Sequence, residues 1–99
     1  MKILVIGSGA REHAILRSLA ADPDVDVLVA APGNPGMAQF AELAAVRPTD
    51  PDDVLRLARE TGVDLVVIGP EAPLVAGVAD VLRDNGATLV VNDLEELLA

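Results

Sequence analysis

Four short runs of aliphatic, often β-branched residues recur along this chain, and loops and helix-like segments separate them. The runs occupy residues 2–7 (KILVIG), 25–31 (VDVLVAA), 64–68 (DLVVI) and 87–91 (ATLVV). Such apolar runs are typical of strands that are buried on both faces, as in a parallel sheet. Because strands that alternate with helices imply parallel strands joined by right-handed crossovers, we expect an α/β fold, a Rossmann-like three-layer sandwich.

Capping and helix-breaking residues mark the helices between these strands. The first helix is predicted over residues 11–21, where the aliphatic side chains fall on one helical stripe. The second begins at Asp50, whose carboxylate can cap a helix, continues with Pro51, which suits the first helical position, and ends at Gly62. The third is predicted to run to about Asn85.

A short strand near Leu43–Val46 brings the predicted parallel sheet to five strands. Residues 92–99 (NDLEELLA) predict one more helix, which is too short to persist unless it packs on the sheet. The chain length of 99 residues suits a single domain over residues 1–99 with one modest core. Because Phe40 is the one aromatic residue, that core has to be built from Val, Leu, Ile and Ala.

The charge balance and the residue types missing from the chain exclude several classes of function. A formal net charge of −9 and a single lysine, Lys2, argue against a nucleic-acid surface and against anionic membranes, since both need clustered basic residues. No cysteine and no metal-ligand spacing of His, Asp and Glu occur in the sequence, so no metal site is predicted. No apolar run reaches the length of a membrane span. The N-terminal residues pass directly into the first strand, and a cytoplasmic location is predicted.

Three unusual loops follow predicted strands, at residues 7–13 (GSGAREH), 31–36 (APGNPG) and 69–74 (GPEAPL). In open α/β sheets, ligands bind at the carboxyl ends of the strands, where the strand order reverses. In the first loop, Gly7 and Gly9 permit a tight turn and the close approach of a ligand, and the start of the next helix favours an anion. The same glycines also suit an ordinary strand-to-helix turn, and both interpretations stay open.

The first loop departs from the dinucleotide-binding pattern G-x-G-x-x-G. Glu12 stands where the third glycine would allow close packing of helix on strand, and residues 28–31 (LVAA) lack the expected ribose-binding acid. Binding of NAD or FAD is therefore disfavoured. The adjacent His13 has a side chain suited to acid–base chemistry, but a histidine on the helix surface is the favoured interpretation. No Ser or Cys nucleophile with an oriented base is visible, so no catalytic residue is predicted.

The other two loops each present one polar side chain. Asn34 is placed to hydrogen-bond a ligand, although the surrounding residues 32–36 (PGNPG) also suit a simple turn. Glu71 lies between Pro70 and Pro73, and a carboxylate held in such a rigid loop suits ribose hydroxyls or an amine. The alternative is that Glu71 only complements the positive end of the following helix dipole.

Three motifs, VIGSGAREHA, APGNPG and VIGPEAPLVAGVAD, together resemble the N-terminal domain of the glycinamide ribonucleotide synthetase family, the phosphoribosylamine–glycine ligases of purine biosynthesis. The resemblance extends, in order, to about Val91. It implies a Rossmann-like domain of the pre-ATP-grasp type. It also implies that the whole family enzyme joins phosphoribosylamine to glycine, with ATP and magnesium, through a glycyl-phosphate intermediate.

The resemblance further implies a substrate-binding site assembled from the three loops. The first loop would approach a phosphoribosyl ligand instead of a dinucleotide, and Glu71 would contact the sugar-amine substrate. The resemblance assigns no catalytic residue and no metal ligand to this chain. The implied substrate-binding residues are Gly7, Gly9, Arg11, Glu12, His13, Gly33, Asn34, Gly36, Gly69, Pro70 and Glu71.

Two departures from the family pattern bear on what the chain does alone. Ala10 stands where the family usually has glycine, and residues 92–99 stand where the family continues with a G-P-type loop and the ATP-grasp region. The nucleotide-binding lysine, the magnesium carboxylates and the glycine site of that region are not in this sequence. We therefore expect an excised or engineered domain that binds a phosphoribosyl small molecule weakly, has no cofactor of its own and does not catalyse alone.

Two other interpretations of the chain stay open: a designed or reconstructed α/β scaffold without biochemical activity, and a mononucleotide-binding module. A weak homodimer is also expected, because a domain separated from a larger enzyme exposes apolar surface that its neighbour once covered. The surfaces expected to take part are residues 40–43 and the C-terminal Leu94, Leu97 and Leu98.

Overall fold

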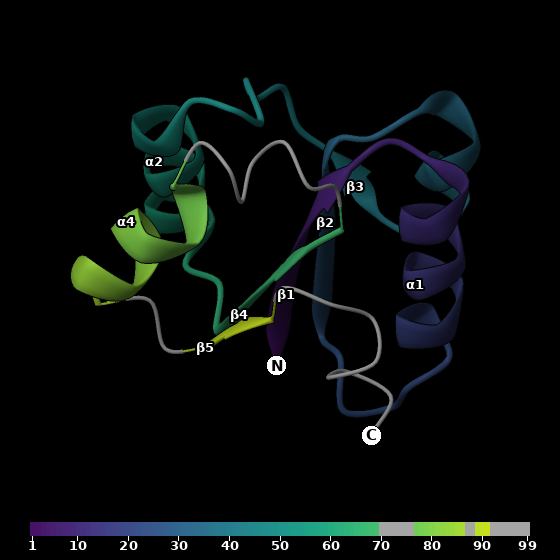
Figure 1. Ribbon diagram of the computed structural model, residues 1–99. Helices are drawn as coiled ribbons and strands as arrows, with labels where there is room; N and C mark the ends of the chain where they lie inside the picture. Colours follow the sequence, from purple (N-terminus) through teal and green to yellow (C-terminus); the bar gives the residue numbers. More distant parts are fainter. Residues whose placement is uncertain (70–76, 87–88, 92–99) are drawn as a thin grey trace.

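The computed structural model describes residues 1–69, 77–86 and 89–91 of the chain, and the structural statements below refer to these residues. The elements are β1 (Lys2–Gly7), α1 (Ala10–Ala20), β2 (Val27–Pro32), the 3-10 helix η1 (Pro35–Gln39), β3 (Glu42–Leu43), α2 (Pro51–Thr61), β4 (Leu65–Ile68), α4 (Val78–Asp84) and β5 (Leu89–Val91). The strands form one parallel sheet in the order β3-β2-β1-β4-β5, and helices cover both of its faces (Figure 1).

Both faces of the sheet are buried, because successive residues of its strands point to opposite sides. Leu4 and Ile6 of β1 belong to a core cluster shared with α2 and α4. Ile3 and Val5 belong to a second cluster, shared with α1. Figure 1 shows the corresponding layers, with α1 on one side of the sheet and α2 and α4 on the other. The predicted α/β class with a parallel sheet is therefore confirmed.

The third predicted strand is much shorter than expected. In place of a strand near Leu43–Val46, the chain has a two-residue pairing of Glu42 and Leu43 with β2. Both side chains of β3 are exposed, so this edge element gains little apolar burial that could hold further residues in a strand. Four strands of the described sheet thus have three or more residues, and the two-residue β3 is the fifth member of the strand order. The predicted extent of this short strand, to Val46, was wrong.

The helix boundaries follow local sequence signals. The Oδ1 atom of Asp50 accepts hydrogen bonds from the backbone N–H groups of Asp52 (3.1 Å) and Asp53 (3.3 Å) at the start of α2. The same helix ends at Gly62, whose φ of 64° is left-handed, a conformation that favours glycine. Both ends agree with the prediction. Helices α1 and α4 also end within one residue of their predicted ends.

The path of the chain through the sheet creates a switch point between β1 and β4. From β1 the chain builds outward through β2 and β3, and it then returns to the other side of β1 for β4 and β5. Ile6 of β1 pairs with Ile68 of β4, and Gly7 pairs with Pro32 of β2. The carboxyl ends of the three central strands therefore lie level at one edge of the sheet, at the top of Figure 1.

Some predictions fall on residues that lie outside the described chain, namely Pro70, Glu71 and the last helix over residues 92–99. Of the surfaces expected in a homodimer, the described part contains the segment that ends at Leu43, whose side chain is 42% exposed; the homodimer itself stays a prediction. None of the described helices has the length and apolar character that a membrane crossing requires.

Candidate functional site

The candidate site lies at the switch point, where the carboxyl ends of β1 and β4 meet. Gly7 is the last residue of β1, Gly69 follows β4, and both are buried. The backbone N–H of Gly69 donates to the carbonyl of Ile6 at 3.3 Å and so joins the two strand ends. Helix α1 begins beside these strand ends, with Gly9 as its N-cap. In open α/β sheets, ligands bind outside the carboxyl ends of the strands at such a switch point.

The side chain of Glu12 fills the space between the two strand ends. Glu12 is the third residue of α1 and only 6% exposed. A Cβ atom at Gly7 would overlap its carboxylate, and one at Gly69 would lie 2.7 Å from its carboxyl carbon. Non-bonded carbon atoms pack at about 3.5–4.0 Å, so a side chain at either position would displace Glu12. The two glycines therefore make room for a buried carboxylate.

This packing gives a physical reason for the broken glycine pattern. In a dinucleotide-binding loop, the third glycine lets the helix approach the strand. Here a long side chain stands at that position, and part of the space it needs comes from Gly69, directly after β4. The backbone N–H of Gly9 donates to Oε1 of Glu12 at 3.4 Å, which is the half of a capping box that a third-position acid supplies.

Arg11, the residue before Glu12, also reaches the end of β4. Its Nη1 atom donates to the carbonyl of Gly69 at 3.4 Å. The side chain is exposed, and it forms no ion pair within the described part of the chain. A guanidinium carries five donors in a fork that matches phosphate and carboxylate oxygens. Arg11 therefore has further N–H donors that could bind an anion beside the ends of β1 and β4.

The loop after β2 is tied to the loop after β1 by two hydrogen bonds. The N–H of Gly33 donates to the Gly7 carbonyl at 3.0 Å, and Nδ2 of Asn34 donates to the Ser8 carbonyl at 2.8 Å. The Oδ1 atom of Asn34 accepts from the N–H of Gly36 at 3.0 Å and so caps η1. Asn34 thus holds the two loops together, and its predicted contact with a ligand stays a prediction.

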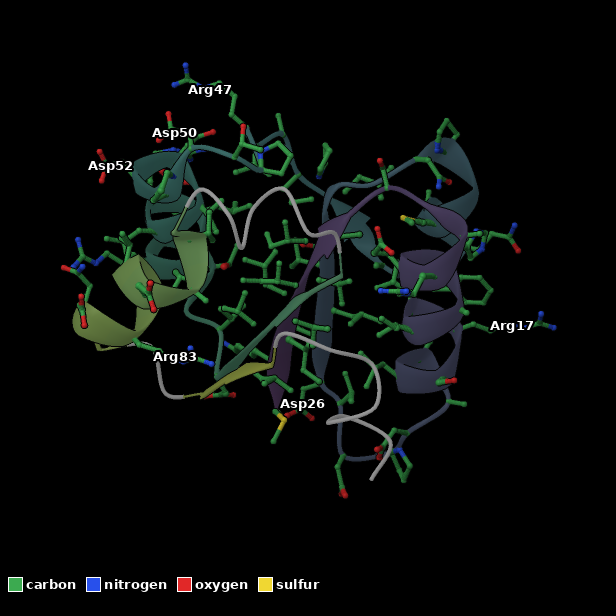
Figure 2. The ribbon with its side chains drawn as sticks, viewed as in Figure 1. Arg17, Asp26, Arg47, Asp50, Asp52 and Arg83 are labelled. Atoms are coloured by element: carbon green, nitrogen blue, oxygen red, sulfur yellow. The ribbon has the colours of Figure 1, made fainter. Side chains whose placement is uncertain are left out.

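His13 points toward η1 and packs against the second loop. Its ring meets that of Phe40 edge-on, with centroids 5.6 Å apart, and it lies beside the Cα atom of Gly36. The side chain is half-buried, so the expected surface histidine instead joins α1 to η1. Figure 2 shows Arg17 extending outward from α1, away from the sheet. An open groove of about 660 Å³ runs along this face, lined by Ala10, His13, Ala14, Arg17, Ser18, Gln39 and Phe40.

The structure divides the predicted site residues into three groups. Those that meet at the ends of β1 and β4 are Gly7, Gly9, Arg11, Glu12 and Gly69. Those that belong to the neighbouring contact between the second loop, α1 and η1 are His13, Gly33, Asn34 and Gly36. Those that lie outside the described chain are Pro70 and Glu71.

Sequence reasoning missed two participants in this arrangement. The Ser8 carbonyl, which receives the Asn34 amide, is a backbone group, and no residue type could have indicated it. Phe40 was available as a signal, because a sole aromatic residue near a sole histidine suggests an aromatic pair. Within the described residues, no cluster of three His, Asp or Glu side chains could hold a metal ion. The groups gathered at the ends of β1 and β4 are a carboxylate, a guanidinium and backbone N–H groups, which can form hydrogen bonds and ion pairs.

A parallel sheet whose strand order reverses beside its first strand places the chain among the open-sheet α/β domains. More particularly, the chain belongs to the family described as Phosphoribosylglycinamide synthetase, N domain, whose model matches residues 1–94. The family that the three motifs resemble is thereby confirmed.

Similar bacterial proteins are named phosphoribosylamine–glycine ligase. The chain is 60% identical over 86 residues to the phosphoribosylamine–glycine ligase of Streptomyces coelicolor, which covers 87% of this chain and 21% of that protein. It is 58% identical over 86 residues to the enzyme of that name in Mycobacterium tuberculosis, covering 87% of this chain and 20% of that protein. It is 55% identical over 86 residues to the protein of that name in Agrobacterium fabrum, again covering 87% of this chain and 20% of that protein. The chain thus spans about a fifth of the length of these curated relatives.

Proposed function

We propose that this chain is the substrate-binding part of a phosphoribosylamine–glycine ligase, and that a phosphoribosyl ligand binds beside the ends of β1 and β4. Family membership and the names of the relatives support a role in this ligase of purine biosynthesis. The Rossmann-like, pre-ATP-grasp assignment of the fold, a single domain over residues 1–99, and the soluble cytoplasmic location belong to the same proposal.

The observation that carries the proposal is the convergence of two loops on the switch point. Asn34 and Gly33 bind the second loop to the first, and Arg11 reaches across to Gly69. A sugar phosphate needs a cation for its phosphate and fixed polar groups for its hydroxyls. Arg11 supplies the cation without an acidic partner in the described part of the chain, in a protein whose net charge is −9.

The resemblance implies ATP and magnesium for the whole family enzyme. The described residues offer no cluster of three metal-ligating side chains, so the proposal assigns to this domain the binding of the sugar ligand alone. Phosphoryl transfer needs positioned cations and metal ligands. We therefore expect this chain to release no ADP above background when it is mixed with ATP, glycine and phosphoribosylamine.

The binding proposal is tested by following the backbone amide signals during titration with ribose 5-phosphate. We expect shifts at Gly9, Asn34 and Gly69, and affinity in the millimolar range, because the chain covers only about a fifth of its relatives. The variant Arg11→Gln should bind about tenfold or more weakly, since a charge-assisted hydrogen bond to phosphate contributes about 1.5–3 kcal/mol. The matched control is Arg17→Gln, which removes a cation from the outer face of the same helix and should leave affinity unchanged.

The outcomes of the titration separate the alternatives. If millimolar ribose 5-phosphate shifts no amide signal, the proposal is contradicted. The interpretation as a scaffold without biochemical activity then remains. Tighter binding of AMP than of ribose 5-phosphate at the same amides would favour a mononucleotide-binding module. The contact of Glu71 with the ligand, which rests on the sequence alone, predicts weaker binding by Glu71→Gln with little change in melting temperature.

A further inference from the structure

The Glu12 carboxylate is buried with less hydrogen bonding than it can accept. The side chain is 94% removed from solvent, since 6% of the residue stays exposed. Its one hydrogen bond within the described chain is the long one from the Gly9 N–H to Oε1, at 3.4 Å. An ionised carboxylate has about four acceptor positions, and buried charges are ordinarily paired. The second oxygen, Oε2, has no donor within the described part of the chain.

Three neighbouring groups at the strand ends form hydrogen bonds with partners other than Glu12. Arg11 donates from Nη1 to the Gly69 carbonyl and forms no ion pair with Glu12. The N–H of Gly69 donates to Ile6, and that of Gly33 donates to Gly7. The Glu12 carboxylate is therefore a negatively charged hydrogen-bond acceptor. The described protein groups around it provide neither a donor for Oε2 nor a positive charge.

We propose that Glu12 is the subsite for an amine of the bound ligand, with Oε2 accepting a hydrogen bond from a protonated nitrogen. This inference rests on the proposed function and adds to it which part of the ligand reaches the ends of β1 and β4. A protonated amine brings both a donor and the missing positive charge, whereas a hydroxyl brings only a donor. A phosphate at this place would be repelled, so the phosphate lies toward Arg11 and the amine toward Glu12.

The surroundings of the carboxylate favour a ligand contact over a purely structural role. A third-position glutamine satisfies an N-cap N–H as well as a glutamate does, so capping alone does not need a buried charge. Three residues around the carboxylate, Gly7, Gly9 and Gly69, have no side chain that could cover it. Gly9 is exposed and a Cβ placed there would lie 4.0 Å from Oε2, so the approach to the carboxylate passes over Gly9.

The test compares two stable ligands that differ only in the group at the amine position. One is the carbocyclic analogue of phosphoribosylamine, in which a methylene replaces the ring oxygen so that the amine does not hydrolyse. The other carries a hydroxyl in place of that amine. We expect the unsubstituted protein to bind the amine about tenfold or more tightly than the hydroxyl. Glu12→Gln, which keeps the capping acceptor, should lose this preference and bind both ligands as the unsubstituted protein binds the hydroxyl.

A matched control and a second measurement keep the test decisive. Glu60→Gln changes an exposed glutamate on α2 and should leave the preference intact. If Glu12→Gln does not fold, the carboxyl carbon of Glu12 in the unsubstituted protein, observed by carbon-13 NMR, should shift with the amine and not with the hydroxyl. Equal binding of the two ligands would overturn the role of Glu12 while leaving the proposed function in place. Binding of neither ligand would overturn both.

Discussion

Helices α1 and α2 each begin with an acidic first turn, but the two turns use their carboxylates differently. In α2, Asp50 caps the helix and Asp53 accepts the backbone N–H of Arg47 at 2.7 Å. In α1, the N-cap is Gly9, which has no side chain, and the acid is the buried Glu12. The first arrangement completes itself from neighbouring residues, and the second leaves a carboxylate at the edge of the sheet.

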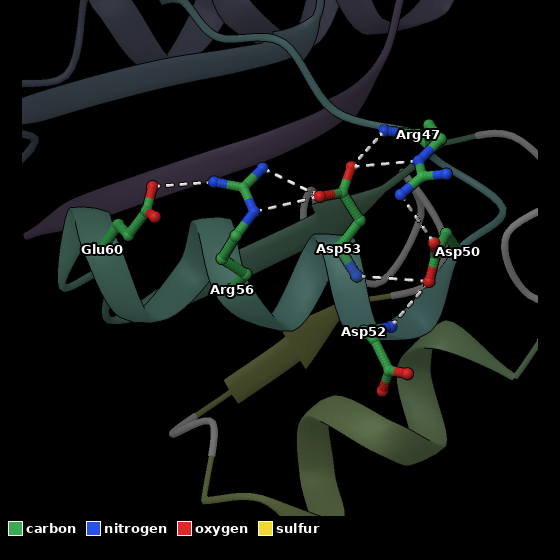
Figure 3. A network of polar contacts seen from close by, with 6 residues as sticks. All are labelled: Arg47, Asp50, Asp52, Asp53, Arg56 and Glu60. Atoms are coloured by element: carbon green, nitrogen blue, oxygen red, sulfur yellow. Dashed lines mark hydrogen bonds and ion pairs between the residues drawn. The ribbon is translucent and has the colours of Figure 1, made fainter.

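The network at α2 pairs the charges of Asp50, Asp53, Arg56 and Glu60 with one another and with Arg47. Figure 3 shows Arg47 between the two aspartates, and Arg56 between Asp53 and Glu60. Arg56 donates from Nε (3.0 Å) and Nη2 (2.9 Å) to Asp53 and from Nη1 to Glu60 at 2.8 Å. These contacts hold the pKa of Asp53 below its ordinary value and raise that of Arg56.

The difference between the two helices indicates which N-terminus could bind a ligand. The anion-binding capacity of a helix N-terminus comes from its unsatisfied N–H groups and from the dipole. At α2, the carboxylate of Asp50 already accepts from the N–H groups of Asp52 and Asp53. At α1, Gly9 is exposed and has no side chain, and Arg11 lies in the same turn without an ion pair in the described residues. The comparison therefore favours the start of α1 over that of α2 as the place for the proposed ligand.

The largest expected effect is on the packing of Glu12 between strands. Gly69→Ala should lower the free energy of unfolding by about 2 kcal/mol, because the new Cβ would collide with the buried Glu12 side chain. Combining it with Glu12→Ala should recover about 1 kcal/mol or more of that loss, since contacting sites couple. Urea unfolding of the two single variants and the double variant measures the coupling.

A control for this cycle is Gly9→Ala, where a Cβ would lie at an ordinary distance of 3.5 Å from Oε1 of Glu12. Its cost should stay within about 0.5 kcal/mol, as for most surface substitutions. Additive effects of Gly69→Ala and Glu12→Ala would show that the glycine does not serve the carboxylate.

A smaller effect is expected at the cap of α2. Asp50→Ala removes the acceptor of two backbone N–H groups and should cost about 1 kcal/mol. Asp50→Asn keeps an acceptor and should cost distinctly less, which separates capping from the ion pair with Arg47 at 3.4 Å. Chemical denaturation at low and high salt provides the comparison, because salt weakens the ion pair and leaves the cap. An equal loss in both variants would assign the effect to charge.

The sequence could predict those features of the fold that depend on residues close together along the chain. The apolar runs located β1, β2, β4 and β5, and β1, β2 and β4 contribute side chains to both core clusters. The pair Asp50–Pro51 and the glycine at position 62 located both ends of α2, since capping is local. The edge element β3 was overestimated because apolar composition alone does not show that a side chain lacks a partner across the sheet.

The arrangement of the candidate site could be predicted only in part, because its decisive contacts are non-local. The fold rule that ligands bind at strand ends directed attention to the loops after β1 and β4, and the structure brings Gly7, Glu12 and Gly69 together there. Glu12 and Gly69, however, are far apart in sequence, and no local pattern shows that one makes room for the other. The bond from Asn34 to Ser8 spans 26 positions. Such contacts follow from the register of the sheet.

The smallest expected effect is the acid sensitivity of the α2 network. The backbone N–H of Arg47 and, secondarily, the side chain of Arg56 lower the pKa of Asp53 below its ordinary value of 3.8. A carboxyl group whose pKa is lower in the folded state stabilises the fold above its unfolded-state pKa. That contribution is lost as the pH falls through the folded-state pKa. Asp53→Asn should therefore be less stable than the unsubstituted protein near neutral pH.

The difference between the two proteins should shrink as the pH falls below 3.8. The measurement is the urea midpoint of both proteins from neutral to strongly acidic pH. Asp26 also has a lowered pKa, from its hydrogen bond and charge interaction with the N-terminal amine, so the variant retains part of the acid dependence. Asp26→Asn serves as the matched control, since it removes that second contribution and leaves the α2 network in place. If the urea midpoints of Asp53→Asn and of the unsubstituted protein change with pH in parallel, the charge of Asp53 does not contribute to the stability of the helix.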